Sequence, residues 1–236
     1  MNISVIIPAY NEEKYIGRCL QSVMLHRSPN VIEIIVVDNG STDRTVEIVR
    51  QFPTVTLLSM AEKGVESAKQ AGYELSKGDI IAFLDADTFI PPKWFEKIND
   101  HFSGTLKTIA LSGPYIHDDL PRLQRFILWL YTILCAAPLS MLIGNMLMGG
   151  NCAILRNALI QAGGFDLSYS LGGEDIHLAE RLKKIGHIRF DLHFNAYSSG
   201  RRFLMNGFWY SGTIYFLNYW YNTIFHTPFK WNTDIR

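Results

Sequence analysis

The sequence predicts an α/β domain built on a mostly parallel sheet that is flanked by helices, of the Rossmann-like type. Short β-branched runs alternate with helical patterns through the first half of the chain, which is typical of strand–helix–strand units. The strand candidates are apolar on both faces, as expected for strands that helices cover on both sides. The length of 236 residues fits one such domain that carries one or two insertions.

The elements follow one another simply along the chain. The predicted strands span residues 2–8, 31–37, 55–59 and 79–84, with a further apolar strand over Cys152–Leu155. The predicted helices run from an N-cap at Ser41 through Phe52, from Gly64 to Lys77 with Gly78 closing it, and from Pro91–Pro92 to about Phe102. Residues 157–184 return to helical patterning, with a turn at Gly163, Gly164 and Phe165.

Charge and cysteine content exclude some classes of protein. With 22 basic and 22 acidic residues the chain carries no net field, so we expect no nucleic-acid partner. Cys19, Cys135 and Cys152 are odd in number and lie in apolar sequence, which predicts thiols in a reducing compartment rather than disulfides or a zinc site. The first residues lack a basic segment and a cleavage site, so we expect a cytosolic catalytic face.

Segments that contain polar residues follow three of the predicted strands at their carboxyl ends, where open parallel sheets bind ligands. They are Pro8, Ala9, Tyr10, Asn11 and Glu12 after the first strand, Asp38 to Asp43 after the second, and Asp85, Ala86 and Asp87 after the fourth. Asp85 and Asp87 form an Asp-X-Asp motif that can aim two carboxylates at one point. Magnesium or manganese suits that point, because either ion completes its shell with phosphate oxygens and water. Such an ion would neutralise charge on a diphosphate leaving group.

Four motifs together resemble the family 2 inverting glycosyltransferases of the GT-A fold: PAYNEE at 8–13, VVDNGSTD at 36–43, GD at 78–79 with FLDAD at 83–87, and GGED at 172–175. The resemblance covers roughly residues 2–200. It implies a hexosyltransferase-type enzyme that uses a nucleotide diphosphate sugar, such as a UDP- or GDP-sugar. It also implies that the 8–12 turn and Asp38 hold the base and ribose, while Asp85 and Asp87 hold the diphosphate and Mn²⁺ or Mg²⁺.

Glu174 and Asp175 precede a helical pattern and are expected in the first turn of that helix. Acidic residues there are common caps, and the helix dipole also keeps a carboxylate ionised, as a general base requires. The resemblance implies that Asp175 is the base, with Glu174 as an acceptor ligand or cap. Lys69 stands where relatives often have an arginine that approaches the nucleotide. It therefore contacts the nucleotide or is a solvated helix lysine.

Four further residues have two interpretations each. The resemblance places Gly150 and Asn151 under the donor sugar and the acceptor, and the alternative is a turn. Arg201 and Arg202 grip the diphosphate, or else form the basic edge of a membrane-facing helix. The QxxRW motif of processive relatives is absent, which predicts the addition of one sugar per encounter.

Two long stretches, residues 126–155 and 203–229, contain no Asp, Glu, Lys or Arg. If the first crossed a bilayer once, Asp87 and Asp175 would lie on opposite sides and could not share a site. Pro138 and Gly144 break this stretch into short helices, and Trp129 and Tyr131 suit a membrane interface. We therefore expect apolar membrane-associating helices, with burial in the core or in an oligomer interface as the alternative.

These observations predict a domain organisation and a setting. A GT-A domain spans 1–200, with a nucleotide-binding half over 1–113 and an acceptor half over 114–200 that carries an apolar insertion at 126–148. An aromatic-rich segment, 201–236, serves membrane association or oligomerisation. We expect a cytoplasmic protein that lies peripherally on the inner face of the cell membrane and acts on a lipid-linked or glycan acceptor. A homo-oligomer is compatible with these observations. Rival interpretations are a sugar nucleotidyltransferase and a catalytically inactive GT-A scaffold at a membrane.

Overall fold

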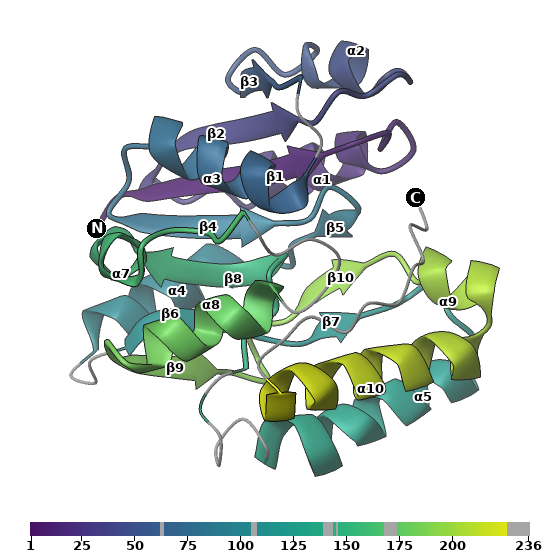
Figure 1. Ribbon diagram of the computed structural model, residues 1–236. Helices are drawn as coiled ribbons and strands as arrows, with labels where there is room; N and C mark the ends of the chain where they lie inside the picture. Colours follow the sequence, from purple (N-terminus) through teal and green to yellow (C-terminus); the bar gives the residue numbers. More distant parts are fainter. Residues whose placement is uncertain (62–63, 105–107, 139–143, 145, 168–173, 226–236) are drawn as a thin grey trace.

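A seven-stranded sheet forms the centre of the molecule, and a three-stranded sheet lies beside it (Figure 1). The computed structural model describes residues 1–236 except 62–63, 105–107, 139–143, 145, 168–173 and 226–236. The large sheet has the order β3-β2-β1-β4-β8-β6-β9 and the small one β5-β10-β7. The strands of the large sheet are β1 (Ile3–Ala9), β2 (Val31–Asp38), β3 (Thr56–Ser59), β4 (Ile80–Leu84), β6 (Thr108–Ser112), β8 (Asn151–Leu155) and β9 (His187–Phe190).

All neighbouring strands of the large sheet pair in parallel except β8, which is antiparallel to both β4 and β6. The predicted α/β class with a mostly parallel sheet is therefore confirmed. The antiparallel strand β8 has a consequence for the site. Because it runs against β4, its first residue and the turn that precedes it lie beside the carboxyl end of β4, where Leu84 pairs with Asn151.

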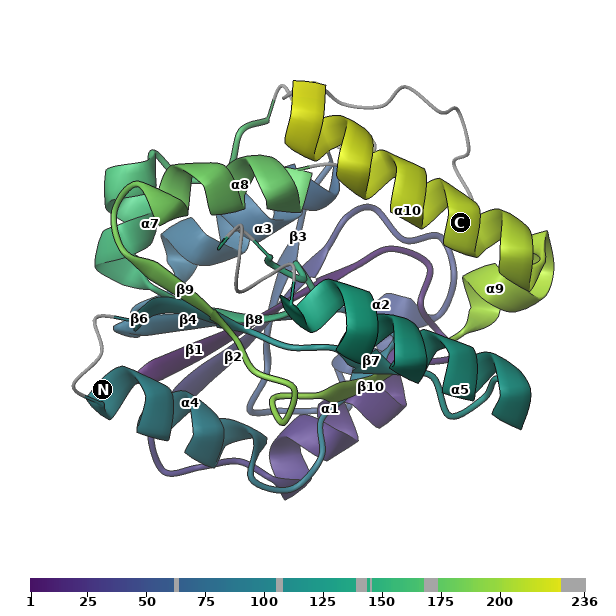
Figure 2. The same ribbon diagram turned by 90° about the horizontal axis from the view of Figure 1, so that it is seen from below.

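Helices cover both faces of the large sheet, as Figure 2 shows from below. The helices are α1 (Ile16–Leu25), α2 (Thr45–Val49), α3 (Val65–Leu75), α4 (Trp94–Ser103), α5 (Arg122–Tyr131) with the π-helical turn η1 (Thr132–Ala136), α7 (Arg156–Ala162), α8 (Glu174–Lys183), α9 (Arg201–Asn206) and α10 (Phe208–Phe225). On one face, α1 and α4 pack on Ile3, Val5 and Ile7 of β1. On the other, α3, α7 and α8 pack around Ile6.

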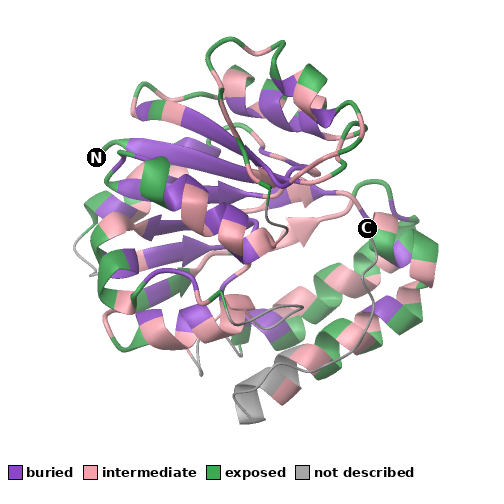
Figure 3. Cartoon of the chain, turned by 45° about the horizontal axis from the view of Figure 1, so that its top comes forward, coloured by how far each residue is buried: buried purple, intermediate pink, exposed green. Residues whose placement is uncertain are grey.

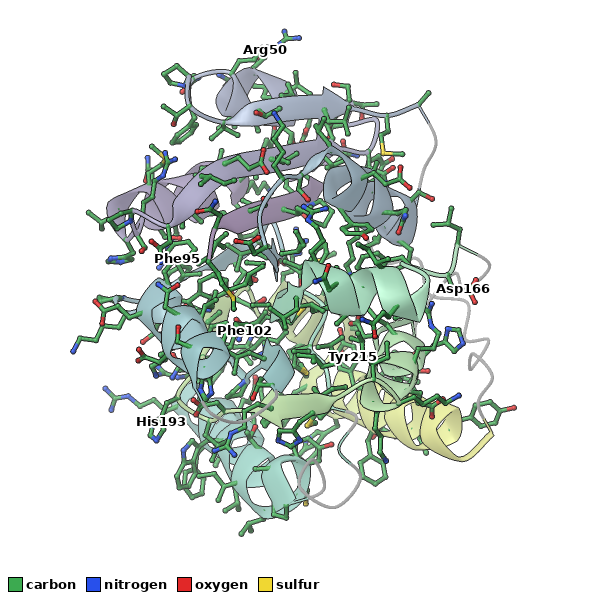
Figure 4. All side chains as sticks on the ribbon, turned by 90° about the vertical axis from the view of Figure 1, so that its left-hand side faces the viewer. Arg50, Phe95, Phe102, Asp166, His193 and Tyr215 are labelled. Atoms are coloured by element: carbon green, nitrogen blue, oxygen red, sulfur yellow. The ribbon has the colours of Figure 1, made fainter. Side chains whose placement is uncertain are left out.

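This double cover explains why the strands are apolar without alternation, because both faces of each strand are buried. The residues Phe95 and Phe102, marked in Figure 4 on α4, are buried in the first of the two cores together with Trp94. The turn at Gly163 and Gly164 ends α7 as predicted, since both glycines adopt left-handed φ angles of 79° and 71°.

The predicted N-cap at Ser41 is wrong. The helix α2 begins at Thr45, where the backbone N–H of Thr45 donates to Asp43 Oδ1 at 3.0 Å. Ser41 instead accepts a hydrogen bond from the backbone of Asn11 at 2.9 Å, so its side chain joins two turns rather than starting a helix. Two other helices, α3 and α4, lie within the predicted ranges.

The small sheet comprises β5 (Thr88–Phe89), β7 (Tyr115–Ile116) and β10 (Ala196–Ser198). In Figure 1 it lies beyond the carboxyl ends of β1 and β4. Strand β10 pairs antiparallel with β5 and parallel with β7. Since β5 follows Asp87 and β10 precedes Arg201, this pairing brings those two segments together.

The described parts of the two uncharged stretches are largely exposed. The helix α5 has no buried residue, and Leu123, Phe126 and Trp129 are 55–69% exposed (Figure 3). On α9 and α10, Met205 and Trp209 are more than 70% exposed. Burial in the core of this chain is therefore wrong for α5. Among the residues that the structure describes, no helix combines the length and hydropathy needed to cross a bilayer.

Candidate active site

The turns that follow β1 and β2 are joined to each other by hydrogen bonds. Asn11 adopts a left-handed φ of 54°, and its Oδ1 accepts the backbone N–H of Thr42 at 2.8 Å. The backbone N–H of Glu12 donates to Thr45 Oγ1 at 2.8 Å. Asp38, which is 3% exposed, accepts the backbone N–H of Ser41 at 3.2 Å. The predicted base- and ribose-binding turns thus form one connected surface beside the carboxyl ends of β1 and β2.

Asp85 and Asp87 leave β4 at the same edge, separated by the buried Ala86. Burial raises the pKa of both carboxyls, and the charge of Asp87 raises the pKa of Asp85 further. Tyr115, on β7, donates its hydroxyl to Asp85 Oδ2 at 3.1 Å. Two carboxylates are therefore held in a poorly solvated place where each disfavours the charge of the other.

The turn before β8 brings backbone, without side chains, up to two of the carboxylates. A Cβ on Gly150 would lie 1.9 Å from Asp85 Oδ2, and a Cβ on Gly149 would lie 2.0 Å from Asp175 Oδ1. The carbonyl of Gly150 accepts the backbone N–H of Asp85 at 3.1 Å, and the N–H of Gly149 donates to Asp175 Oδ2 at 3.0 Å. The Gly149–Gly150 pair thus links Asp85, a predicted metal ligand, to Asp175, the predicted base.

Asp175 lies in the first turn of α8, as predicted, and its side chain is 32% exposed. Its Oδ1 accepts a hydrogen bond from Lys69 Nζ at 3.1 Å. Lys69 is 3% exposed and also pairs with Glu66 at 3.1 Å. The interpretation of Lys69 as a solvated helix lysine is therefore wrong, because its ammonium group is buried between two carboxylates.

Burial alone would lower the pKa of Lys69, but the charges of Asp175 and Glu66 outweigh it and raise that pKa well above its usual value. For Glu66, burial is the largest effect, and it raises the pKa to about 7 against the opposing influence of Lys69. Lys69 is therefore a permanent cation within the protein.

Arg201 approaches the site from the end of β10. Its Nη1 donates to Glu12 at 2.7 Å, and its Nη2 lies 3.1 Å from Asp87 Oδ2. Burial would lower the pKa of Arg201, while Glu12 and Asp87 raise it. Asp119 fixes the preceding turn by accepting the backbone N–H of Gly200 at 2.8 Å. The described structure therefore places Arg201 between the turn that follows β1 and the Asp-X-Asp motif, at the predicted site.

The other predicted residues divide between the site and the framework. Arg202 donates to the hydroxyl of Tyr215 on α10 at 3.3 Å. The side chain of Asn151 is fully buried and donates to the carbonyls of Gly113 and Phe194, while its Oδ1 accepts from Trp94. All its polar atoms are therefore engaged in holding strands together. Pro8 and Ala9 end β1, Tyr10 follows them, and Glu174 begins α8.

Sequence reasoning missed two residues of this arrangement, Tyr115 and Glu66. Glu66 stands three residues before Lys69 on the same face of α3, a spacing that by itself suggests a pair. No local pattern marks Tyr115, because its contact with Asp85 depends on the position of the small sheet.

The donor groups at Asp85 and Asp87 fit a hard divalent cation. They are carboxylate oxygens, buried together, so a bound cation would relieve the repulsion between them. Among the described residues, no cluster of three or more His, Cys, Asp or Glu side chains forms a complete protein cage. Magnesium and manganese need no such cage where substrate phosphates supply the remaining ligands.

The fold and this arrangement define a class: an α/β protein of the GT-A type, with an acidic edge at the carboxyl ends of its strands. Comparison with known proteins then gives the family. The profile of glycosyl transferase family 2 matches residues 4–161, and the chain belongs to that family.

Individual relatives match over shorter stretches. Glycosyltransferase AglE of Haloferax volcanii is 42% identical over 109 residues, covering 44% of this chain and 36% of AglE. Among solved structures, Staphylococcus aureus TarS (residues 1–349) matches with a TM-score of 0.67 at 20% identity, over 84% of this chain and 60% of that one. The mannosyltransferase PcManGT of Pyrobaculum calidifontis, in complex with GDP-Man and Mn²⁺, matches with a TM-score of 0.66 at 21% identity, over 84% and 56%. The chain thus spans about a third of AglE, and the structural matches establish the shared fold.

Proposed function

We propose that this chain transfers one sugar, with inversion, from a nucleotide diphosphate sugar to an acceptor, assisted by Mn²⁺ or Mg²⁺. The observation that carries the proposal is the convergence of Asp85 and Asp175 on the Gly149–Gly150 turn, with Asp87 two residues after Asp85. Matched structures with GDP-Man and Mn²⁺ or with UDP-GlcNAc support a nucleotide-sugar donor, because those proteins share this fold.

Each group has a place in the proposed reaction. The turn at 8–12 and Asp38 bind the base and ribose, and Asp85 and Asp87 hold the cation, which supplies Lewis-acid stabilisation of the leaving diphosphate when bound. Asp175 accepts the proton of the acceptor hydroxyl as that oxygen attacks the anomeric carbon and the bond to the diphosphate breaks. Arg201 lies near enough to Asp87 to contact the diphosphate as its charge develops.

A bilayer surface is the proposed setting, and a lipid-linked molecule the proposed acceptor. The helix α5 exposes Phe126 and Trp129 together with the basic Arg122 and Arg125, a combination that suits the interface of an anionic membrane. Exposed aromatics on α10, including Trp209, extend the apolar surface. A peripheral position on the cytoplasmic face would bring a water-soluble donor to an acceptor that cannot leave the bilayer.

Calorimetry with a nucleoside diphosphate tests the metal site. We expect wild type to bind UDP or GDP more tightly with Mn²⁺ than without it, and Asp87→Ala to lose that gain while keeping its circular dichroism spectrum. Glu96→Ala, a change in the first turn of α4, is the matched control and should bind like wild type. Unchanged Mn²⁺-dependent affinity in Asp87→Ala would reject the assignment.

Asp175→Asn tests the base. The amide keeps the shape of the side chain but cannot take a proton, so turnover should fall by about 10²- to 10⁴-fold while donor binding persists. Turnover is measured as nucleotide diphosphate released from UDP-GlcNAc, UDP-glucose and GDP-mannose. Near wild-type turnover would reject the role, except with a phosphate acceptor, which is already anionic and needs no base.

The same assay separates the rival interpretations. A sugar nucleotidyltransferase would release pyrophosphate or consume it, and an inactive scaffold would release neither product while still binding vesicles. Release of the nucleoside diphosphate with transfer of the sugar excludes both.

A further inference from the structure

The carboxylate of Asp175 is held from two directions. Lys69 Nζ donates to Oδ1 at 3.1 Å, and the backbone N–H of Gly149 donates to Oδ2 at 3.0 Å. The two donors come from α3 and from the turn before β8, while Asp175 itself belongs to α8. Three separate elements therefore fix the orientation of one side chain that remains 32% exposed.

The ammonium group of Lys69 is itself held by a residue that plays no part in the proposed reaction. Glu66 lies 3.1 Å from Lys69 Nζ, one turn earlier on α3, and its side chain is only 8% exposed. A buried lysine is costly unless its charge is compensated, and Glu66 supplies one compensating charge and Asp175 the other. Lys69 Nζ thus donates to Asp175 from a position that Glu66 fixes on the same helix.

From this geometry we propose that Lys69, supported by Glu66, is a positioning residue for the base Asp175 rather than a ligand of the nucleotide. The proposal rests on the proposed function, in which Asp175 takes the acceptor proton. Lys69 directs one oxygen of the Asp175 carboxylate, while Glu66 holds the ammonium group of Lys69 in place.

Movement of Lys69 toward a nucleotide would be expensive. Its side chain is 4% exposed, and leaving its position would strand the buried carboxylate of Glu66. The other charged groups that influence it, Glu174 and Asp85, are also acidic, and the ring of Phe165 lies 5.8 Å from Nζ. All the described charges around Lys69 therefore hold the cation where it is.

The test is the split between turnover and nucleotide affinity in three variants. Lys69→Met removes the cation that orients Asp175, so kcat should fall at least tenfold with unchanged affinity for UDP or GDP. Lys69→Arg keeps the charge and should restore part of the loss. Glu66→Gln keeps the size of the side chain that holds Lys69, so kcat should fall less than in Lys69→Met.

Matched controls lie on or near the same helix. Lys77→Met and Glu74→Gln alter exposed side chains just beyond and at the end of α3, and both should keep the wild-type kcat. An unchanged kcat in Lys69→Met, or weaker nucleotide binding in that variant, would overturn the proposal. Should Lys69→Met fail to fold, Lys69→Arg decides, because an affinity for UDP or GDP that falls while kcat is unchanged would mean that Lys69 binds the nucleotide.

A second measurement needs no turnover. In urea unfolding, Lys69→Met and Asp175→Asn should be strongly non-additive, because each removes the same contact. Additive effects would refute the contact. If the cycle shows coupling but wild type releases no nucleotide diphosphate from any donor, the proposed function fails and the pairing stands.

Discussion

Two regions of this molecule depart from the usual distribution of polar and apolar groups, and they do so in opposite directions. At the carboxyl ends of β1 and β4, the charged side chain of Lys69 is buried and that of Asp85 is partly buried. On α5 and α10, aromatic side chains such as Trp129 and Trp209 are exposed. Both arrangements cost free energy in an isolated chain, because charges prefer water and large apolar surfaces avoid it.

The difference between the regions lies in whether the chain supplies the partners. In the acidic edge, Glu12 meets Arg201 and Asp175 meets Lys69, so most of the compensation is internal. The exposed apolar side chains of α5 gain no such compensation, since none of its residues is buried. The first region suits a ligand that enters it, and the exposed side chains of the second region are where the proposed membrane surface would lie.

The largest expected effect comes from adding one methyl group to the first region. Gly150→Ala places a Cβ 1.9 Å from the carboxylate of Asp85, so this side chain must shift. A displacement of this size typically costs about 10²-fold in turnover. Nucleotide diphosphate release and Mn²⁺-dependent binding of UDP or GDP should both be impaired.

The control for that change lies in the second region. A Cβ on Gly212, within α10, meets nothing within 4 Å, so Gly212→Ala should keep activity and stabilise the helix by up to about 1 kcal/mol. Equal activity of the two alanine variants would show that the first region tolerates an added methyl group as well as the second does. That result would contradict the close packing of Gly150 against Asp85.

A charge added to the second region or to the buried core sharpens the contrast. Trp209 is 73% exposed, so Trp209→Glu should leave the domain folded and reduce sedimentation with anionic vesicles about tenfold, as lost apolar contact and added repulsion predict. Ile98 is fully buried on α4, and Ile98→Glu should unfold the chain by burying an unpaired charge.

Sedimentation and light scattering distinguish the surfaces that the exposed helices could meet. Vesicle binding by a monomer supports the membrane. A stable dimer that ignores vesicles, and that Trp209→Glu dissociates, would instead identify a second copy of the chain as the partner and refute the membrane proposal.

The smallest expected effect is a pH dependence of stability caused by Glu66. Its pKa rises from 4.5 to about 7 on folding, so the folded state holds this proton more tightly. The stability that the protonated group contributes is complete below about pH 4.5 and is lost as pH rises to about 7. Urea unfolding should show this decline in wild type.

Glu66→Gln removes the titrating group and should flatten that part of the stability profile. Glu74→Gln, at an exposed position on the same helix, should retain the decline. Identical profiles in both variants would mean that Glu66 does not titrate between these pH values, and that its charge is as well solvated as the charges of the exposed surface.

The sequence was most informative where function depends on the end of a strand. Asp85 and Asp87 directly follow an apolar run, and Asp175 opens a helical pattern, so their positions could be predicted from periodicity. The two-faced burial of β1 and β4 followed from the same reasoning.

Contacts between distant segments could not be predicted in the same way. Ser41 looks like a helix cap because capping is a local preference, but Asn11 competes for its hydroxyl oxygen. Asn151 follows two glycines and looks like a site residue, whereas the packing of β8 turns it toward buried carbonyls. The burial of Lys69 depends on α8, which no pattern near Lys69 reveals.

The contact between Lys69 and Asp175 joins positions 106 residues apart and so spans the two halves of the domain. During synthesis, Lys69 and Glu66 emerge long before the residue that completes their charge balance. A growing chain that lacks α8 holds a lysine with only one of its two carboxylate partners, and the packing of α3 on the sheet is correspondingly less favourable. When α8 docks, the same hydrogen bond that completes the core also sets the side chain of Asp175. Docking of α8 and orientation of Asp175 are therefore coupled, and a chain trapped short of the native fold would lack this oriented carboxylate.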